Sequence, residues 1–257
     1  MRKTTTCLLL PVLLFCCFSA NAQNIALGVR GGISIPNLSA GGGNQNPINT
    51  GYSSRQGPDA GIFAEFKISD LFSIQPMIEY SSQGGKKNGL QALTTPDEFA
   101  QAFPPGQVPT YLYANFNSEA KLNYLLVPIL AKFGWDLSNK SPFRIYIDAG
   151  PFVGFLLSAH QVTSGQSQFF LDPQGQQALP APAQSFDSNT DIKDQLHSTN
   201  FGISGNVGLN YKFGLSNIFI EGGGNYGFLN IQQGTANGKN NTGAATVSFG
   251  YSYWFGK

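Results

Sequence analysis

Apolar and polar residues alternate along most of this chain with a period of two, which is the period of a β-strand. In residues 200–213 the odd-numbered positions are apolar or glycine, and the even-numbered positions are Asn, Gly, Ser or Lys. A helical period is confined to the first residues of the chain and to part of a stretch at 96–103. The alternation predicts eight strands, at residues 25–35, 58–68, 71–82, 119–133, 143–158, 200–213, 218–231 and 245–255.

The connections between these predicted strands differ in length in a regular way. Long or medium connections follow the odd-numbered strands, and short ones follow the even-numbered strands, at 69–70, 134–142 and 214–217. In an up-and-down meander, alternate connections lie at opposite ends of the sheet, so one end receives every long connection. Outer-membrane barrels have this asymmetry, with long external loops and short periplasmic turns. An even number of strands also places both termini in the periplasm.

A soluble secreted lipocalin-like barrel that binds a hydrophobic ligand inside would alternate too, and the polar face separates the two possibilities. In water that face should be rich in Lys and Glu, but here it consists mainly of Gly, Ser, Asn and Thr. Small polar side chains suit the narrow lumen of an eight-stranded barrel, which side chains just fill. We therefore predict an all-β fold, an eight-stranded antiparallel up-and-down transmembrane β-barrel whose apolar face contacts outer-membrane lipid.

Aromatic residues gather near the ends of the predicted strands, where a barrel meets the two membrane interfaces. One group lies beside the short turns and the last strand end: Phe66, Phe72, Phe133, Trp135, Phe143, Phe213, Phe219 and Phe255. A second group lies beside the long connections: Tyr80, Phe116, Phe155, Phe201 and Phe228. We expect these groups to form the two aromatic girdles of the barrel.

Residues 1–22 are predicted to be a secretory signal peptide, which is cleaved to leave residues 23–257 as the barrel domain. Two basic residues precede the apolar stretch 7–18, and Ala20-Asn21-Ala22 forms a small-residue cleavage site. The apolar stretch is shorter than the ~20 residues that a membrane-spanning helix needs. All three cysteines lie in this segment. Disulfides, thiol catalysis and zinc–thiolate sites are therefore not expected in the mature chain.

Charge and composition narrow the function further. Charged residues make up 11% of the chain, against about 25% in a typical soluble domain. The formal net charge is +1, and it becomes slightly negative when the two basic residues of the signal peptide are removed. A nucleic-acid partner would require a strongly basic surface, so this class of partner is excluded.

The candidates for catalysis and metal binding are few. His160 and His197 flank a long connection, with Ser158 and Ser198 close in sequence, but the spacing matches no outer-membrane hydrolase motif. Residues 187–191 begin like a calcium-binding loop with oxygen ligands at alternate positions, yet the turn glycine and the final Glu of such a loop are missing. We predict no catalytic residue, no cofactor and no metal site.

Charged residues on the polar face form the remaining constellation. A selective pore or a proton path is one interpretation, and a set of paired charges that fills the lumen is the other. We favour structural pairing, because an eight-stranded barrel leaves no aqueous channel, and Lys212 with Glu221 is the expected best pair. The predicted lumen charges are Arg30, Asp59, Glu65, Lys67, Glu79, Arg144, Asp148, Lys212 and Glu221.

Four strand motifs carry a resemblance to a known family: GVRGGIS at 28–34, NYLLVPIL at 123–130, DAGPFVG at 148–154 and FGYSYWF at 249–255. They resemble the PorT-like outer-membrane β-barrel proteins of the Bacteroidetes. The resemblance implies an outer-membrane location and an eight-stranded barrel, and it brings no functional residues.

The expected function follows from the barrel and its long loops. We expect a non-enzymatic barrel that is structural, adhesive or accessory to a surface or secretion complex. Other envelope proteins are the candidate partners of the long loops. Two alternatives stay open: an outer-membrane lipid-modifying hydrolase and the soluble lipocalin-like barrel.

Overall fold

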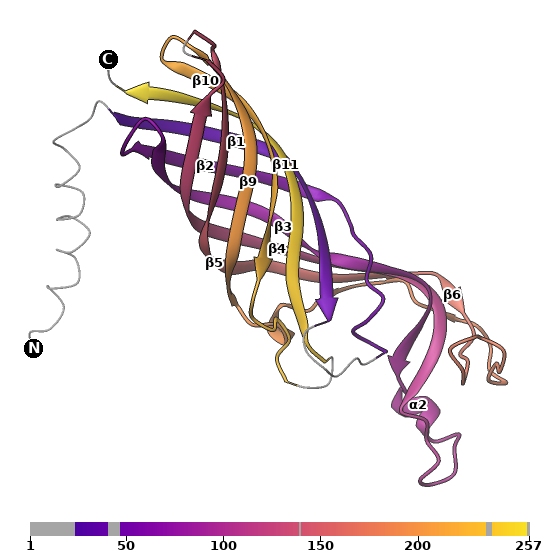
Figure 1. Ribbon diagram of the computed structural model, residues 1–257. Coiled ribbons are helices and arrows are strands. Elements are labelled where there is room, and N and C mark those ends of the chain that lie inside the picture. Colours follow the sequence, from indigo (N-terminus) through magenta and orange to yellow (C-terminus); the bar gives the residue numbers. More distant parts are fainter. Residues whose placement is uncertain (1–23, 41–46, 139, 235–237, 256–257) are drawn as a thin grey trace, which may run out of the picture.

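The computed structural model describes residues 24–40, 47–138, 140–234 and 238–255, and the predicted signal peptide lies outside them. Eight long antiparallel strands form one closed ring (Figure 1), because β1 pairs with both β2 and β11, and β4 pairs with β5. This confirms the predicted fold class. The ring consists of β1 (Ile25–Ala40), β2 (Gly57–Lys67), β3 (Phe72–Thr94), β4 (Tyr111–Asp136), β5 (Phe143–Ser164), β9 (Thr199–Phe213), β10 (Ser216–Gly227) and β11 (Asn240–Phe255).

The two ends of the ring differ as predicted. The short turns after β2, β4 and β9 lie at the end where β1 begins and β11 ends, and the long connections lie at the other end (Figure 1). We call these the turn end and the loop end. No helix in the described parts of the chain is long and apolar enough to cross a membrane.

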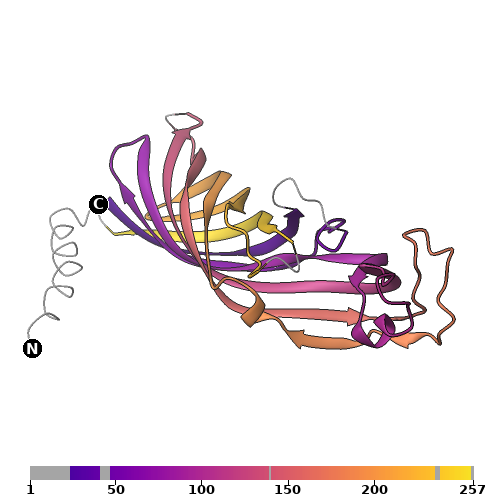
Figure 2. The same ribbon diagram turned by 90° about the horizontal axis from the view of Figure 1, so that it is seen from below.

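The predicted long loop at 83–118 is mostly strand. β3 continues to Thr94 and β4 starts at Tyr111, so the two strands form a hairpin that projects beyond the ring at the loop end (Figure 2). The period-two pattern is weak there because Asn, Gln and Gly stand at many positions, and cross-strand pairing decided the outcome. The short helix α2 (Asp97–Ala100) lies at the hairpin tip, inside the stretch 96–103 where helical character was expected.

The long connection 159–199 also contains more pairing than its sequence indicated. β5 continues to Ser164, and β8 (Ser188–Asp191) pairs with its outer part. The short strands β6 (Gln166–Ser167) and β7 (Gln184–Ser185) pair with each other, and the 3-10 helix η3 (Lys193–Gln195) leads back to the ring.

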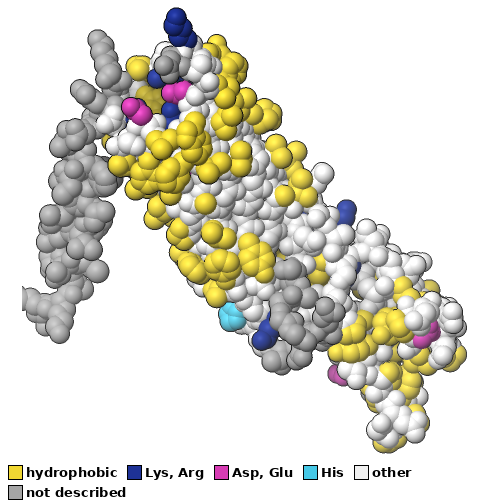
Figure 3. Space-filling view, viewed as in Figure 1, with side chains coloured by type: hydrophobic (Ala, Val, Ile, Leu, Met, Phe, Trp, Pro, Cys, Tyr) yellow, Lys and Arg dark blue, Asp and Glu magenta, His cyan; other side chains and the backbone are white. Residues whose placement is uncertain are grey.

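The outer face of the ring is apolar and the inner face is mostly polar. On β1, Leu27, Val29 and Ile33 are each 52% exposed, whereas Arg30 and Ser34 are buried in the lumen. Apolar side chains cover the barrel wall, and charged side chains lie near its ends (Figure 3). A soluble lipocalin has the opposite arrangement, with a polar exterior around an apolar interior. The soluble alternative is therefore wrong.

Most of the aromatic residues expected at the interfaces lie on the outer face, including Phe133, Trp135, Phe213 and Phe255 at the turn end. Phe219 is a correction, because its side chain is buried in the lumen. Its neighbours Ile218 and Ile220 point outward, so strand alternation turns Phe219 inward. Phe116 is a second correction, because it does not belong to a girdle of the barrel. It lies in the projecting hairpin, where its ring stacks on Phe186 of the connection after β5.

Glycines make room for large side chains in the lumen. At four places a glycine lies directly across from an aromatic residue on the neighbouring strand, and a Cβ atom on the glycine would overlap the ring. At Gly250 that Cβ would lie 2.0 Å from Cζ of Phe219. Four of the 31 glycines are thus explained by ring packing in a lumen too narrow for two side chains. The pairs are Gly28–Phe63, Gly208–Tyr146, Gly202–Phe152 and Gly250–Phe219.

We predict that Gly250→Ala destabilises the barrel, because the new methyl group must displace the Phe219 ring. Overpacking of this kind typically costs about 1–3 kcal/mol. Gly222→Ala is the matched control, since a Cβ there would have its nearest neighbour at 3.9 Å. Urea titration of the folded barrel in detergent measures both free energies of unfolding. Equal values for the two variants would contradict the packing argument.

Candidate functional site

The middle of the lumen holds a cluster of charged side chains contributed by four strands. Arg30 on β1 lies 2.5 Å from Oε1 of Glu221 on β10 and 2.8 Å from Oε2 of Glu79 on β3. Asp59 on β2 lies 3.8 Å from the same guanidinium. All four side chains are almost fully buried. We call these four residues the Arg30 cluster.

Arg30 joins strands that are not neighbours in the ring. β3 and β10 are each two strands away from β1, so the contacts of Arg30 with Glu79 and Glu221 cross the lumen. Tyr146 on β5 donates a hydrogen bond of 2.6 Å to the other oxygen of Glu221. The cluster therefore ties together strands on several sides of the barrel. No group of described residues could hold a metal ion.

A second layer of polar side chains lies between the Arg30 cluster and the loop end. Gln83 donates to Ser81 and to Asn225 across the lumen, at 3.0 and 3.1 Å. Asn200 donates to Thr242 at 2.9 Å. These hydrogen bonds join β3 to β10 and β9 to β11, and they leave the barrel interior filled with ordered side chains.

The predicted pair of Lys212 and Glu221 is wrong. In the β9–β10 hairpin, Lys212 lies opposite Asn217, and Glu221 lies opposite Gly208. Lys212 is therefore at the exposed turn end, while Glu221 is four residues further into the barrel and is buried. Both residues lie on the polar face, as predicted, but the prediction did not take into account how far each residue lies from the turn.

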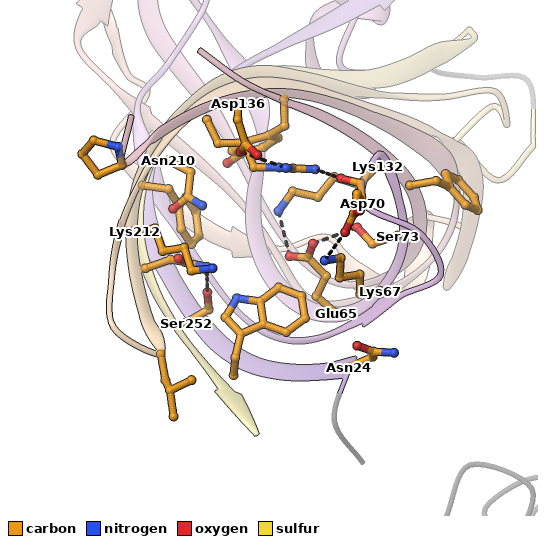
Figure 4. Close-up of a pocket in the computed structure, with 18 of the residues that line it drawn as sticks. Asn24, Glu65, Lys67, Asp70, Ser73, Lys132, Asp136, Asn210, Lys212 and Ser252 are labelled. Carbon is orange, nitrogen blue, oxygen red and sulfur yellow. Dashed lines mark hydrogen bonds and ion pairs between the residues drawn. The ribbon is translucent and has the colours of Figure 1, made fainter. Parts of the chain in front are cut away.

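The charges at the turn end form pairs around an open cavity of about 620 Å³ (Figure 4). Lys132 contacts Glu65 at 2.9 Å, and Arg144 contacts Asp136 at 3.0 Å. Lys132 was not predicted, because it follows residues 124–131, which are apolar on both faces, and Asp136 was not predicted, because it lay in the expected connection 134–142. Even-numbered positions of β4 point inward, so the alternation of the outer part of the strand could have identified Lys132.

Two further predicted lumen charges, Lys67 and Asp148, lie outside the Arg30 cluster and have other partners. Lys67 contacts Asp70 in the short turn at 2.7 Å. The hydrogen bond from Lys67, together with its charge, lowers the pKa of Asp70. Asp148 accepts a hydrogen bond of 2.8 Å from Asn206 on the neighbouring strand. Both side chains thus find their partner in the same turn or on the neighbouring strand.

The cavity at the turn end does not continue through the barrel. Tyr146 and Phe219 lie at its inner side, and Nζ of Lys132 sits 4.1 Å from the centre of the Tyr146 ring. Beyond them follow the Arg30 cluster and then an apolar cluster that fills the lumen near the loop end. That cluster contains Leu38, Ala120, Leu122, Tyr124, Leu126, Phe152, Leu156, Ala159, Leu196 and Ile231.

The apolar cluster explains why part of β4 is apolar on both faces. Leu122 and Leu126 point inward, and Ile129 on the other face is exposed on the barrel wall. The register between β4 and β5 shifts at Asn123 and Tyr124. Leu196 comes from the connection after η3, so this connection closes the lumen at the loop end.

The described part of the connection between β1 and β2, residues 47–56, also packs against the loop end. Arg55 donates to Oγ of Ser82 and to the carbonyl oxygen of Gln83, at 2.8 and 2.9 Å, and pairs with Glu119 at 2.7 Å. Nζ of Lys87 donates to the carbonyl oxygen of Ile48. Burial in this contact lowers the pKa of Lys87 to about 8.

The structure does not bring the candidate serine and histidine side chains together. Ser158 accepts a hydrogen bond from Asn123, and no hydrogen bond between a histidine and a serine side chain occurs among the described residues. The calcium-like segment is extended, because β8 pairs with β5. An extended strand cannot wrap its side chains around one cation in the way that a calcium-binding loop does.

We predict that Arg30→Met strongly destabilises the barrel, because Asp59, Glu79 and Glu221 lose the one cationic partner that they have among the described residues. Removing one partner of a buried pair typically costs about 3–5 kcal/mol. Combining Arg30→Met with Glu79→Gln and Glu221→Gln should recover part of the loss. Lys212→Met at the exposed turn end is the control and should change little. Urea titration measures all variants, and equal effects of the two Met substitutions would contradict a structural role for the cluster.

Three comparisons relate this chain to known proteins. A family model described as an outer membrane protein beta-barrel domain matches residues 21–233. Neisserial surface protein A is 15% identical with a TM-score of 0.39, over 90% of this chain and 99% of that chain. Ail of Yersinia pestis is 9% identical with a TM-score of 0.36, over 90% and 100%. OprG from Pseudomonas aeruginosa is 12% identical with a TM-score of 0.38, over 91% and 98%. No curated protein matches the chain.

Proposed function

This chain belongs to the outer membrane protein β-barrel domain family, and from that premise we propose that it is a closed, non-enzymatic barrel that anchors a folded external projection. The observation that carries the proposal is the hairpin of β3 and β4, which extends far beyond the ring. At about 3.3 Å per residue, its outer part from Gln83 to Thr94 is roughly 36 Å long. We call the outer part of the hairpin, residues 83–118, together with the connection 165–187 that packs on it, the projection.

The projection has a small apolar core of its own. Leu112, Ala114 and Phe169 are buried in it. The Phe99 ring packs on Phe169 with ring centres 4.5 Å apart. Phe116 and Phe186 stack with ring centres 4.4 Å apart. A packed core supports the use of the projection as a rigid binding element, since binding then requires little ordering of the chain.

The filled lumen supports a role other than transport. Aqueous channels occur in barrels of 16–18 strands, and eight strands leave only enough space for side chains. In this protein the Arg30 cluster and the apolar cluster around Leu122 occupy that space in succession. The barrel then serves as a membrane anchor.

The orientation in the membrane follows from the difference between the two ends. Barrels of this class have short periplasmic turns and longer external loops. The turn end with both termini is accordingly periplasmic, and the projection is external. The PorT-like resemblance of the strand motifs supports a surface or secretion complex of the Bacteroidetes as its setting, with the projection as the contact surface for other envelope proteins.

A lipid-modifying hydrolase has less support. Such an enzyme needs a nucleophile and a base within hydrogen-bond reach of each other. His160 lies on β5 opposite Lys121, and the backbone of His197 bonds to Ile231. Neither arrangement brings a serine hydroxyl to an imidazole.

We predict that the purified barrel in planar lipid bilayers shows no steady conductance, because its lumen is filled with side chains. The measurement is single-channel recording at both signs of the applied potential. Arg30→Met is the informative variant, since a rise in conductance would show that the Arg30 cluster closes a path. Stable ion-selective channels in the unmodified protein would make it a porin and refute the proposal.

We predict that Gln107→Cys reacts with a membrane-impermeant maleimide on intact cells, whereas Ser69→Cys does not. Gln107 lies in the projection near its tip, and Ser69 lies in the turn between β2 and β3. With the signal peptide removed, each variant carries a single cysteine as reporter. Ser69→Cys should react once the outer membrane is permeabilised. Labelling at Ser69 on intact cells would reverse the proposed orientation.

A further inference from the structure

The outer edge of β3 in the projection is a strand edge that is open among the described residues. β3 pairs with β4 up to Thr94, whereas its pairing with β2 ends at Ser81. The connection 47–56 adds one further bridge, between Ser53 and Lys86. Past Lys86, no backbone hydrogen bond from the described residues reaches this side of the strand.

Strand alternation shows which backbone groups this edge presents. Lys86 exchanges two backbone hydrogen bonds with Ser53, at 2.8 and 2.9 Å, so its N–H and C=O groups point away from β4. The N–H group of Thr95 points toward β4 and bonds to Thr110. In an antiparallel pair every second residue faces the same neighbour. The outward groups therefore belong to the even-numbered residues 88, 90, 92 and 94.

This edge lacks the residues that usually protect an edge strand from pairing. Exposed edges in native proteins are commonly blocked by charges, proline or short length. Residues 88–94 contain no charge and no proline. A Cβ atom at Gly89 would meet no atom within 4 Å, so the face of the strand is uncovered there. This edge is therefore suited to the addition of another strand.

Opposite charges lie at the two ends of the open edge. Lys86 precedes it, and Asp97 and Glu98 follow it in α2 as exposed side chains. None of the three takes part in an ion pair among the described residues. An antiparallel copy of the same strand brings each end against the other end of its partner, so the positive end of one copy meets the negative end of the other.

We propose that the occupant of this edge is a second copy of the chain, paired antiparallel through β3. Pairing centred on Gln91 places Leu90 opposite Ala92 of the second copy and Asn88 opposite Thr94. Apolar residues then meet apolar residues, and polar residues meet polar ones, with the same surface used on both copies as a two-fold interface requires.

Antiparallel pairing decides where the second copy is anchored. β3 runs from the barrel toward the tip of the projection (Figure 2), so the antiparallel partner has its barrel beyond that tip. The two barrels then lie in two facing membranes, and the contact is homotypic adhesion. The inference rests on the proposed function, because the projection must be external for two cells to meet through it.

The test uses liposomes that carry the purified full barrel, labelled in two populations with donor and acceptor lipids. Wild-type liposomes should cluster, measured by light scattering and energy transfer. Lys86→Glu, and separately Asp97→Lys with Glu98→Lys, should each slow clustering at least about tenfold, since like charges then face each other. Mixing liposomes of these two variants should restore clustering, because each contact then joins opposite charges again. Thr94→Pro, which removes one outward N–H group, should also slow clustering.

Asp194→Lys is the matched control, because it reverses an exposed acidic charge in η3, away from the edge. It should cluster like the wild type. Maleimide labelling of Gln107→Cys counts the projections that face outward on each liposome, so a failure of adhesion is distinguished from a failure of the proposed orientation in cells. Dispersed wild-type liposomes with outward projections, or variants that cluster equally, would overturn the inference.

Discussion

Closure of the strand ring is the constraint on which the rest of this structure depends. In lipid every backbone polar group needs a partner within the protein, so a sheet can span a membrane only when it has no open edge. The pairing of β1 with β11 and of β4 with β5 meets this requirement. Once the ring is closed, alternation assigns one side of each strand to lipid and the other to a narrow lumen. Large apolar residues outside and small polar residues inside are the consequence.

The narrow lumen then determines how the interior is filled. Several aromatic rings fit because the residue across from them is glycine, as at Gly250 and Phe219. The most deeply buried charges meet partners from across the barrel, as Arg30 meets Glu79 and Glu221. Apolar side chains complete the filling near the loop end, with Leu196 supplied by a connection. The same side chains that stabilise the ring therefore also fill its lumen.

In the function that we propose, the binding surface lies outside the ring. Beyond the membrane, water can satisfy an open edge, and β3 and β4 continue there as a hairpin with its own small core. The edge of β3 past Lys86 is available for pairing because the requirement for closure ends with the lipid. In the proposed orientation, that edge faces the outside of the cell.

The sequence by itself determined the strand class, the number of ring strands, the outward apolar face and the alternation of long and short connections, because each depends only on local period and turn composition. It also identified most lumen charges, including Arg30 and Glu221, from their parity along a strand. The partners depended on tertiary structure. Register counted from the turn separated Lys212 from Glu221, and ring closure brought Arg30 to Glu79 and Glu221 from distant parts of the chain. The projection could not be predicted from the sequence. Its polar strands are held by cross-strand pairing and by packing of a distant connection, and neither of these leaves a local pattern in the sequence.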